Sequence, residues 1–306
     1  ILEKEKKKSG FFNRLIFLIN LIFISALLIA YLSPYIKPST SVIPAFFGIA
    51  YPFLLFINLA FVIFWIILFR RKFIYSLIAI LIGWSHLNEV YKIGEAEKTE
   101  EDSTFKVLSY NVRNFDLYNY HKGWKYNHTN RRNIINYIEK EKPDVICLQE
   151  FVYIPESSFN TLDTLLTIMD TKWSKMEILI TNRSNRFGLI IISRFPIINS
   201  GAINIETMGN NGCIFADILI NKDTVRIYNS HLESIHLDKK IYDVEPKSQI
   251  KKSVEIIKNE NSSRQKAKKE SKLIFRYLKR SLLLREKQTS VLNQHIESCN
   301  YPLIVC

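Results

Sequence analysis

The hydrophobic positions of the chain fall into two different patterns. Residues 11–91 are almost wholly apolar, whereas residues 92–306 combine charged and polar stretches with hydrophobic runs of ordinary length. Long apolar runs are typical of helices that cross a membrane, and shorter runs bounded by polar residues are typical of buried strands and amphipathic helices. We therefore expect a helical membrane anchor over residues 11–91, followed by a soluble part.

Three runs inside the anchor approach the length of a membrane-spanning helix. They cover about residues 15–32, 45–69 and 73–91, and the third reaches spanning length only if it continues past Asn88 and Glu89. A buried helical core is a weaker interpretation, because three such runs in succession exceed what a domain of this size would bury.

The distribution of basic residues predicts the orientation of the anchor. Residues 1–10 are rich in lysine, and a second basic cluster at residues 70–72 follows the second apolar run. Because basic clusters favour the cytoplasmic side, three spans place residues 1–10 inside as a cytoplasmic tail and everything after residue 91 outside. If the third run is only interfacial, the soluble part stays in the cytoplasm. Residues 92–104, rich in Glu and Lys, are expected to form a charged linker.

Two predicted strands at the start of the soluble part each end in a polar residue. Residues 105–110 lead to Asn111, and residues 144–148 lead to Glu150, with a helix over residues 130–140 between them. A buried strand that stops at an amide or a carboxylate places that group at the edge of the sheet, where ligand sites of layered α/β proteins gather. We expect Asn111 and Glu150 to form two walls of one site.

A third strand ends in the same way at His231. Residues 213–220 and 224–229 predict a hairpin, and its second strand runs into Asn229, Ser230 and His231. A lone histidine is more often structural than catalytic, and that is the interpretation we give to the other five histidines. His231 differs because its position at a strand end repeats that of Asn111 and Glu150.

The positive charge of the chain is concentrated in one segment. Of the formal net charge of +13, residues 239–287 contribute 16 basic against 6 acidic residues, a net +10, so no basic stripe crosses the whole domain. Residues 272–296 fit an amphipathic helix with basic residues on its open face. Two interpretations of this basic segment stay open: a solvated charged face, or contact with anionic lipid headgroups. The four cysteines lack metal-finger spacing and are expected to be free thiols.

Four stretches of the soluble part form a set of short motifs. They are L-S-Y-N-V at residues 108–112, P-D-V-I-C-L-Q-E at 143–150, the pattern G-x-x-I-x-S-x-x-P at 188–196 and N-S-H-L at 229–232. Together they resemble the motifs of the endonuclease/exonuclease/phosphatase superfamily, which includes DNase I, exonuclease III and the neutral sphingomyelinases. Because all four occur in the family's order and spacing, they are much stronger evidence together than any one of them alone. R-E-K-Q at residues 285–288 also matches the family's R-x-x-Q.

The resemblance covers residues 105–306 and implies an α/β fold, a two-sheet α/β sandwich of the DNase I type, with a basic helical insert over residues 238–287. It implies that Glu150 is a ligand of Mg²⁺, for which Mn²⁺ is an alternative. Asn111 would position the metal or the phosphate, His231 would stabilise charge on the phosphoryl oxygens, and Asn229 would support His231. A hard cation prefers carboxylate oxygen, and phosphate ester hydrolysis needs charge neutralisation and an oriented water. The anchor further resembles a membrane-bound bacterial branch, which implies the bacterial inner membrane, and the three-span orientation given above makes the soluble domain extracytoplasmic.

The chain departs from the family pattern at its end. The family's G-D-F-N motif should follow residues 302–306, and an S-D-H motif should come later, but neither occurs in the 306 residues. We therefore expect a fragment that is itself inactive, and a longer, Mg²⁺-dependent hydrolase of a phosphodiester such as a phospholipid headgroup or the nucleic acid backbone. The alternative is a non-catalytic, membrane-tethered binding protein that retains the fold.

Overall fold

The computed structural model separates the chain into two compact units, Ile1–Lys98 and Thr99–Cys306. It describes residues 2–91, 104–119, 128–207, 209, 211–234 and 263–306. Several features expected from the sequence lie outside these residues, namely most of the charged linker (92–103), His121, His236 and the first part of the basic insert (238–262).

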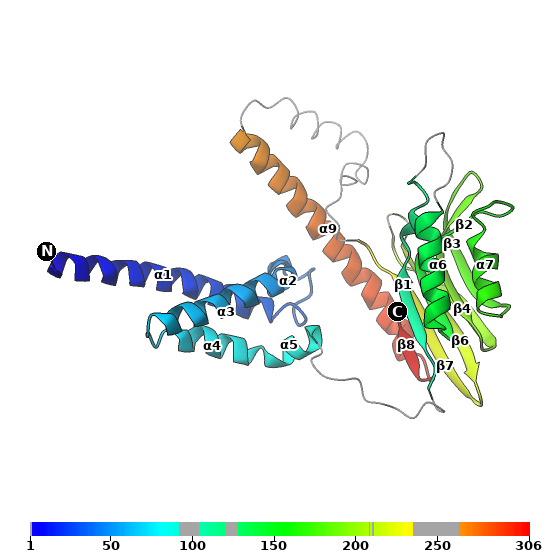
Figure 1. Cartoon of the computed structure of the whole chain (residues 1–306), viewed down its shortest axis with the longest axis horizontal. Coiled ribbons are helices and arrows are strands. Elements are labelled where there is room, and N and C mark those ends of the chain that lie inside the picture. The colour runs from blue at the N-terminus through cyan, green and yellow to red at the C-terminus, as the bar shows by residue number, and fades with distance from the viewer. Residues whose placement is uncertain (1, 92–103, 120–127, 208, 210, 235–262) are drawn as a thin grey trace. The chain divides into compact units, whose positions relative to one another are not determined.

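Helices are the only regular elements among the described residues of the first unit (Figure 1). Its longest helix, α1, contains the basic residues that were expected to form a separate tail as well as the first apolar run. The helices are α1 (Leu2–Ala30), α2 (Val42–Ile49), α3 (Tyr51–Ile67), α4 (Phe73–Ile82) and α5 (Trp84–Val90).

Only the first of the three apolar runs forms one straight helix of spanning length. Phe11–Ala30 is long and apolar enough to cross a membrane. The run over residues 45–69 is divided into α2 and α3, which meet at an angle of 66° and make a second span only if the bent pair counts as one. Pro52 explains the break, because its ring removes a backbone donor and clashes with the preceding turn. The third run is divided at Gly83, which leaves the shorter apolar helix α4.

The second unit contains two four-stranded mixed sheets. In the first sheet the order is β1-β2-β4-β3 and in the second it is β5-β6-β7-β8; β1 pairs with β2, and β7 with β8, in parallel, whereas the other pairs are antiparallel. The strands are β1 (Val107–Asn111), β2 (Val145–Tyr153), β3 (Trp173–Asn182), β4 (Asn185–Ser193), β5 (Ile197–Ile203), β6 (Gly212–Ile220), β7 (Asp223–His231) and β8 (Leu303–Val305).

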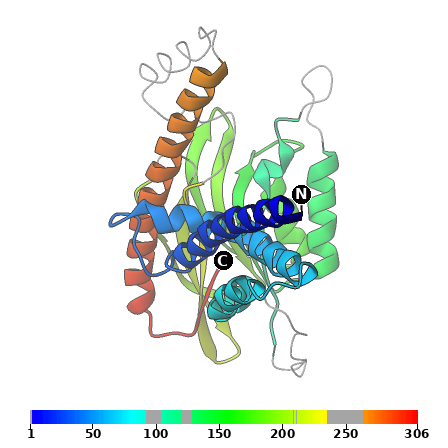
Figure 2. The same ribbon diagram turned by 90° about the vertical axis from the view of Figure 1, so that its left-hand side faces the viewer.

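Strand β2 shows how the layers of this unit pack. Its residues alternate, so that Val145 and Cys147 pack against the second sheet while Ile146 and Leu148 pack against helices α6 (Thr129–Glu141) and α7 (Thr161–Ile168). Helix α9 (Ser263–Glu297) covers the outer face of the second sheet, where Leu292 joins the core. Figure 2 shows α9 and α6 on opposite sides of the strands. The two-sheet α/β sandwich expected from the sequence is confirmed.

Candidate active site

Asn111 and Glu150 lie at the carboxyl ends of two neighbouring parallel strands. The register of β1 and β2 places Asn111 opposite Gln149, the residue before Glu150. Asn111 Nδ2 donates to Glu150 Oε1 at 3.0 Å, and Asn111 Oδ1 accepts from the backbone N–H of Arg113 at 3.0 Å. These two bonds fix the amide with its NH₂ group towards the carboxylate. The structure thus brings the first two expected site residues into contact.

Glu150 occupies a bulge in β2. The pairing of β2 with β4 shifts between Leu148 and Phe151, and Glu150 has a φ of 50°. This left-handed conformation is unfavourable for a residue with a side chain, and it is maintained only where the surrounding structure enforces it. The bulge removes Glu150 from the alternation that buries Leu148 and Phe151, and its side chain is 27% exposed. The carboxylate therefore lies at the rim of the sheet and not in the core.

Gly188 on the neighbouring strand β4 accommodates this bulge. It pairs with Phe151, and a Cβ at Gly188 would lie 1.8 Å from the backbone oxygen of Glu177 on β3. Strand β3 has its own register shift between Ile178 and Ile180 at this level. The glycine of the G-x-x-I-x-S-x-x-P pattern is therefore required by the close approach of two backbones beside Glu150.

His231 ends β7 in the second sheet and approaches the same carboxylate oxygen. Its Nε2 lies 3.6 Å from Glu150 Oε1, and its side chain is 18% exposed. The contact is an ion pair only when the imidazole is protonated. Asn111 from the first sheet and His231 from the second therefore converge on one oxygen of Glu150, at the edge where the two sheets meet.

Buried amide groups set the distance between these two sheets. Gln149 Nε2 donates to Asn229 Oδ1 at 2.7 Å and lies 3.2 Å from Ser109 Oγ. Asn229 Nδ2 donates in turn to the backbone oxygens of Leu148 and Ile190, at 2.9 and 2.8 Å. The side chain of Asn229 is thus fully engaged in joining β7 to β2 and β4, which suits a supporting residue and leaves no group for a substrate.

Gln149 was not among the site residues expected from the sequence. Its position directly before Glu150 was the signal in the sequence that could have identified it. Because successive side chains of a strand point to opposite faces, a residue that precedes a carboxylate at the rim points towards the buried face. A buried amide needs hydrogen-bond partners, and the structure supplies them from the other sheet.

Helix α9 holds the chain directly after His231. The backbone N–H of Glu233 donates to Gln288 Oε1 at 2.9 Å, and its backbone oxygen accepts from Arg285 Nη1 at 3.1 Å. The buried Glu233 side chain also accepts from Asn211 Nδ2 at 2.7 Å. Burial lowers the pKa of Arg285, and the neighbouring Glu233 opposes that shift. The R-x-x-Q pair on α9 is therefore a clamp on the backbone two residues beyond His231.

The loop after Asn111 is held by a carboxylate. Residues 113–116 form a turn, η2 (Arg113–Asp116), in which every residue has a positive φ between 48° and 58°. Asp116 accepts hydrogen bonds from the side chains of Asn119 and Asn130, and these bonds lower the pKa of Asp116. Asp116 thus ties the strained turn behind Asn111 to the first turn of α6.

The donor atoms at this edge are those that a hard divalent cation prefers. Glu150 supplies a carboxylate, and Asn111 supplies an amide. Among the residues that the structure describes, no group of three or more His, Cys, Asp or Glu side chains could hold a metal together. Mg²⁺ at phosphoryl-transfer sites commonly uses one or two carboxylates and keeps several waters, so Glu150 fits as a ligand. The oxygen of Asn111 is already engaged by Arg113, so the present role of Asn111 is to orient Glu150.

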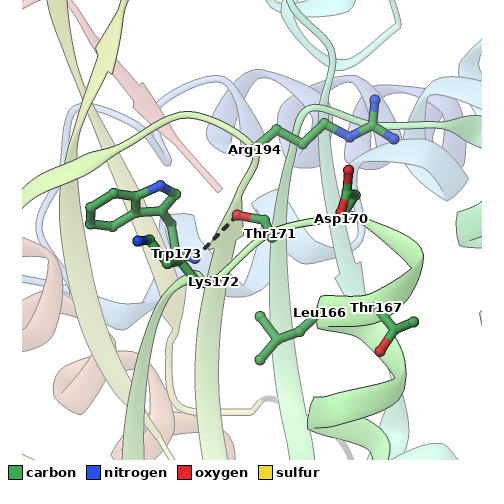
Figure 3. A pocket seen from close by; sticks show the side chains of 7 residues that line it. All are labelled: Leu166, Thr167, Asp170, Thr171, Lys172, Trp173 and Arg194. Carbon is green, nitrogen blue, oxygen red and sulfur yellow. Dashed lines mark hydrogen bonds between the residues drawn. The ribbon is translucent and has the colours of Figure 1, made fainter.

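A polar hollow of about 610 Å³ lies at the other end of the first sheet. Figure 3 shows Arg194, Asp170 and Trp173 among its lining side chains. Trp173 and Val145 both pair with Ser193, at the start of β2, whereas Glu150 lies five residues further along. Five residues of strand span about 17 Å, so this hollow is not part of the candidate site.

Comparisons with known proteins identify two regions of the chain. Residues 13–90 match a domain of unknown function (DUF8431). Residues 108–258 match the endonuclease/exonuclease/phosphatase family, and this range contains Asn111, Glu150, Asn229 and His231. No curated protein matches the chain.

Three solved structures illustrate the range of similar proteins. An endonuclease/exonuclease/phosphatase family protein from Leptotrichia buccalis is 16% identical, with a TM-score of 0.32, over 52% of this chain and 64% of that one. One from Beutenbergia cavernae is 13% identical, with a TM-score of 0.34, over 51% of this chain and 44% of that one. TDP2 from C. elegans is 16% identical, with a TM-score of 0.32, over 61% of this chain and 54% of that one.

The family assignment does not depend on these distant structural similarities. It rests on the match over residues 108–258, on the two-sheet sandwich, and on the meeting of three motif residues at one sheet edge. The second unit of this chain therefore belongs to the endonuclease/exonuclease/phosphatase superfamily.

Proposed function

We propose that this protein is a membrane-anchored hydrolase of phosphoesters that depends on Mg²⁺, with Mn²⁺ able to replace it. The observation that carries the proposal is the convergence of Asn111 and His231, from two different sheets, on Glu150 Oε1. A partly exposed carboxylate with an amide and an imidazole beside it provides a hard metal ligand, a group that orients it, and a donor for phosphoryl oxygens.

Each residue has a separate task in this proposal. A bound Mg²⁺ would neutralise charge on the phosphate and polarise it. Glu150 would hold the ion, and the hydrogen bond from Asn111 would keep the carboxylate in place. His231 would donate from Nε2 to a phosphoryl oxygen, as charge builds up there. Asn229 would hold the end of β7, and so His231, against β2.

The substrate class that we propose is a phosphodiester, in a phospholipid headgroup or in a nucleic acid backbone. Anchoring by the first unit favours the headgroup, with the second unit on the outer side of a bacterial inner membrane. The positive net charge would also suit nucleic acid, whose binding weakens steeply with ionic strength. A salt titration of the hydrolysis rate separates the two: cleavage of a nucleic acid should fall steeply as salt rises, and cleavage of a zwitterionic phospholipid, whose net charge is zero, should change little.

Among the described residues no group of three or more His, Cys, Asp or Glu side chains could hold a metal, and we expect the 306-residue chain alone to bind Mg²⁺ weakly and to hydrolyse nothing at a measurable rate. The end of β8 lies beside β7, since Ser230 N–H donates to the Cys306 oxygen at 2.9 Å.

The assay compares the full-length protein with Glu150→Gln, using bis(p-nitrophenyl) phosphate and Mg²⁺. We expect the variant to lose about 10²-fold or more in rate, because charge stabilisation at the phosphate is lost. Glu139→Gln, on the exposed face of α6, is the matched control and should retain activity. Equal rates for Glu150→Gln and the wild type would rule out this site. A full-length protein that binds Mg²⁺ at Glu150 without hydrolysis would favour the alternative, a non-catalytic binding protein.

A further inference from the structure

The positive charge of the first unit is gathered at one place. Between residues 11 and 88 the sequence contains no acidic residue and five basic ones. Four of these, Arg14, Arg70, Arg71 and Lys72, are called here the basic end; the fifth, Lys37, lies in the connection between α1 and α2. Arg14 belongs to α1, and the other three follow α3 and precede α4. Within residues 11–88, therefore, no acidic residue neutralises this local charge.

Lys72 joins the two parts of the basic end. Its Nζ donates to the backbone oxygen of Asn13 at 3.1 Å, which brings the turn between α3 and α4 beside Arg14 on α1. The same amine lies 4.5 Å from the ring centre of Phe17 and 4.8 Å from that of Trp65. A hydrogen bond and two aromatic faces thus fix the position of this ammonium group.

The fixed ammonium group lies among like charges. Burial lowers the pKa of Lys72, and the positive charges of Arg70 and Arg14 lower it further. Residues 11–88, whose side chains the structure describes, contain no carboxylate that could offset this repulsion. An anion bound between the cations would offset it, and planar arginine side chains bind the oxygens of a phosphate particularly well.

Exposed aromatic residues surround the basic end. Phe11 and Phe12 precede Arg14 by a few positions and are 69% and 63% exposed, while Phe69, which precedes Arg70, is 96% exposed. Such a mixture of arginine, lysine and aromatic side chains at the end of apolar helices is typical of the headgroup level of a bilayer. A ligand that carries both a phosphate and acyl chains matches both sets of side chains.

We propose that the basic end is a binding site for the phosphate of an anionic lipid headgroup. This inference rests on the proposed anchoring of the first unit in a membrane, and it places that end of α1 and the turn between α3 and α4 at one bilayer surface. The site is distinct from Glu150 and from the basic helix α9, both of which belong to the second unit.

The test places the 306-residue chain in nanodiscs of phosphatidylcholine mixed with phosphatidylglycerol. Native mass spectrometry then releases the protein from the nanodisc and measures which lipids stay bound to it. The wild type should retain phosphatidylglycerol several times more often than the composition of the bilayer predicts. Arg70→Gln/Arg71→Gln should lower this preference to the composition of the bilayer. Both arginines are exposed, so the double variant leaves the contacts of Lys72 intact. Lys279→Gln/Arg280→Gln removes the same charge from the exposed face of α9 and should change nothing.

The other outcomes are equally informative. If the wild type shows no preference, or if Arg70→Gln/Arg71→Gln keeps it, the site is ruled out. Loss of the preference in Lys279→Gln/Arg280→Gln alone would assign the lipid contact to α9 and overturn the proposal. Displacement of the lipid by inorganic phosphate would show a site for a free anion instead. Flotation with vesicles of pure phosphatidylcholine tests the anchor separately. If the chain does not float, both the membrane anchoring and the lipid site are ruled out. If it floats but shows no preference for phosphatidylglycerol in the nanodiscs, only the lipid site is ruled out.

Discussion

Gln149 in the first sheet donates its side-chain amide to Asn229 in the second sheet, at 2.7 Å, and so joins the two strand ends that present Glu150 and His231. Both amides are buried. Gln149 directly precedes Glu150 in the chain, and Asn229 lies two positions before His231. The geometry of the candidate site therefore depends on a hydrogen bond in the core.

Gln149→Ala should lower the free energy of unfolding by about 1–3 kcal/mol, because it leaves the buried Asn229 oxygen without a donor. Urea unfolding followed by circular dichroism measures this change. The matched control is Asn182→Ala at the exposed end of β3, which should change stability by less than about 0.5 kcal/mol. Equal stability of the two variants would show that the bond between the sheets is not important.

Gly188→Ala should destabilise the fold by about 1–3 kcal/mol or more, because the added Cβ meets the backbone oxygen of Glu177 at 1.8 Å and the strands must move apart. Gly209→Ala is the control, since a Cβ there meets nothing within 4 Å. Thermal unfolding of both variants tests the prediction. If Gly188→Ala unfolds at the wild-type temperature, the close approach beside the Glu150 bulge is not real.

Asp217 and Arg226 form a buried ion pair on the second sheet, with Nε to Oδ1 at 2.6 Å and Nη2 to Oδ2 at 2.8 Å. Burial by itself raises the pKa of Asp217, but the hydrogen bonds from Arg226 and Asn199 outweigh it and leave the pKa below its ordinary value. Since the folded pKa is the lower one, the stabilisation is complete above the unfolded value of about 4 and disappears as the pH falls through the folded pKa.

Asp217→Asn should therefore cost about 3 kcal/mol at pH 7, and progressively less as the pH falls below about 4. Urea unfolding at several pH values gives the comparison. The control is Glu177→Gln, which removes the ion pair between Glu177 and Lys175 at 3.1 Å. This pair is more exposed than that of Asp217 and Arg226, so its loss should cost less than about 1 kcal/mol. A cost for Asp217→Asn that stays constant down to pH 2 would contradict the assigned charge state.

Gln288→Ala should loosen the clamp on Glu233 and with it the end of β7. It removes the Gln288 partner of two backbone groups, the buried N–H of Glu233 and the partly buried oxygen of Glu206, at a cost of about 1–3 kcal/mol. A specific positioning effect should also change the chemical shifts and increase the mobility of the His231 ring in NMR spectra. Gln294→Ala, exposed on the same helix, should affect neither stability nor the ring. Loss of stability without any change at His231 would make the clamp purely structural.

The sequence pattern predicted the local elements and the strand ends well. The alternation around residues 144–148 and the spacing over residues 130–140 are set by burial against one neighbouring layer, and β2 and α6 occur there. Asn111, Glu150 and His231 could be selected because a polar residue at the end of a buried run has few places to lie except the rim of the sheet.

Features that depend on distant contacts could not be predicted in the same way. The bond between Gln149 and Asn229 joins residues 80 positions apart, and the clamp joins Glu233 to Gln288 over 55 positions. The bulge at Glu150 arises from the register between strands, which one strand's pattern does not contain. The bend of 66° between α2 and α3 occurs at Pro52, inside a run that the hydrophobic pattern alone predicts to be one continuous helix.

The most direct test of the central claim is a titration of the 306-residue chain with Mn²⁺, followed by the NMR signals of the histidine rings. The His231→Gln variant assigns the signal of that ring among the six histidines. Because a bound Mn²⁺ broadens nearby signals, the His231 signal should broaden first, and Glu150→Gln should raise the Mn²⁺ concentration required by about 10-fold or more. Glu139→Gln should leave it unchanged. Broadening of His231 at the same Mn²⁺ concentration in Glu150→Gln and the wild type would contradict a metal site at Glu150.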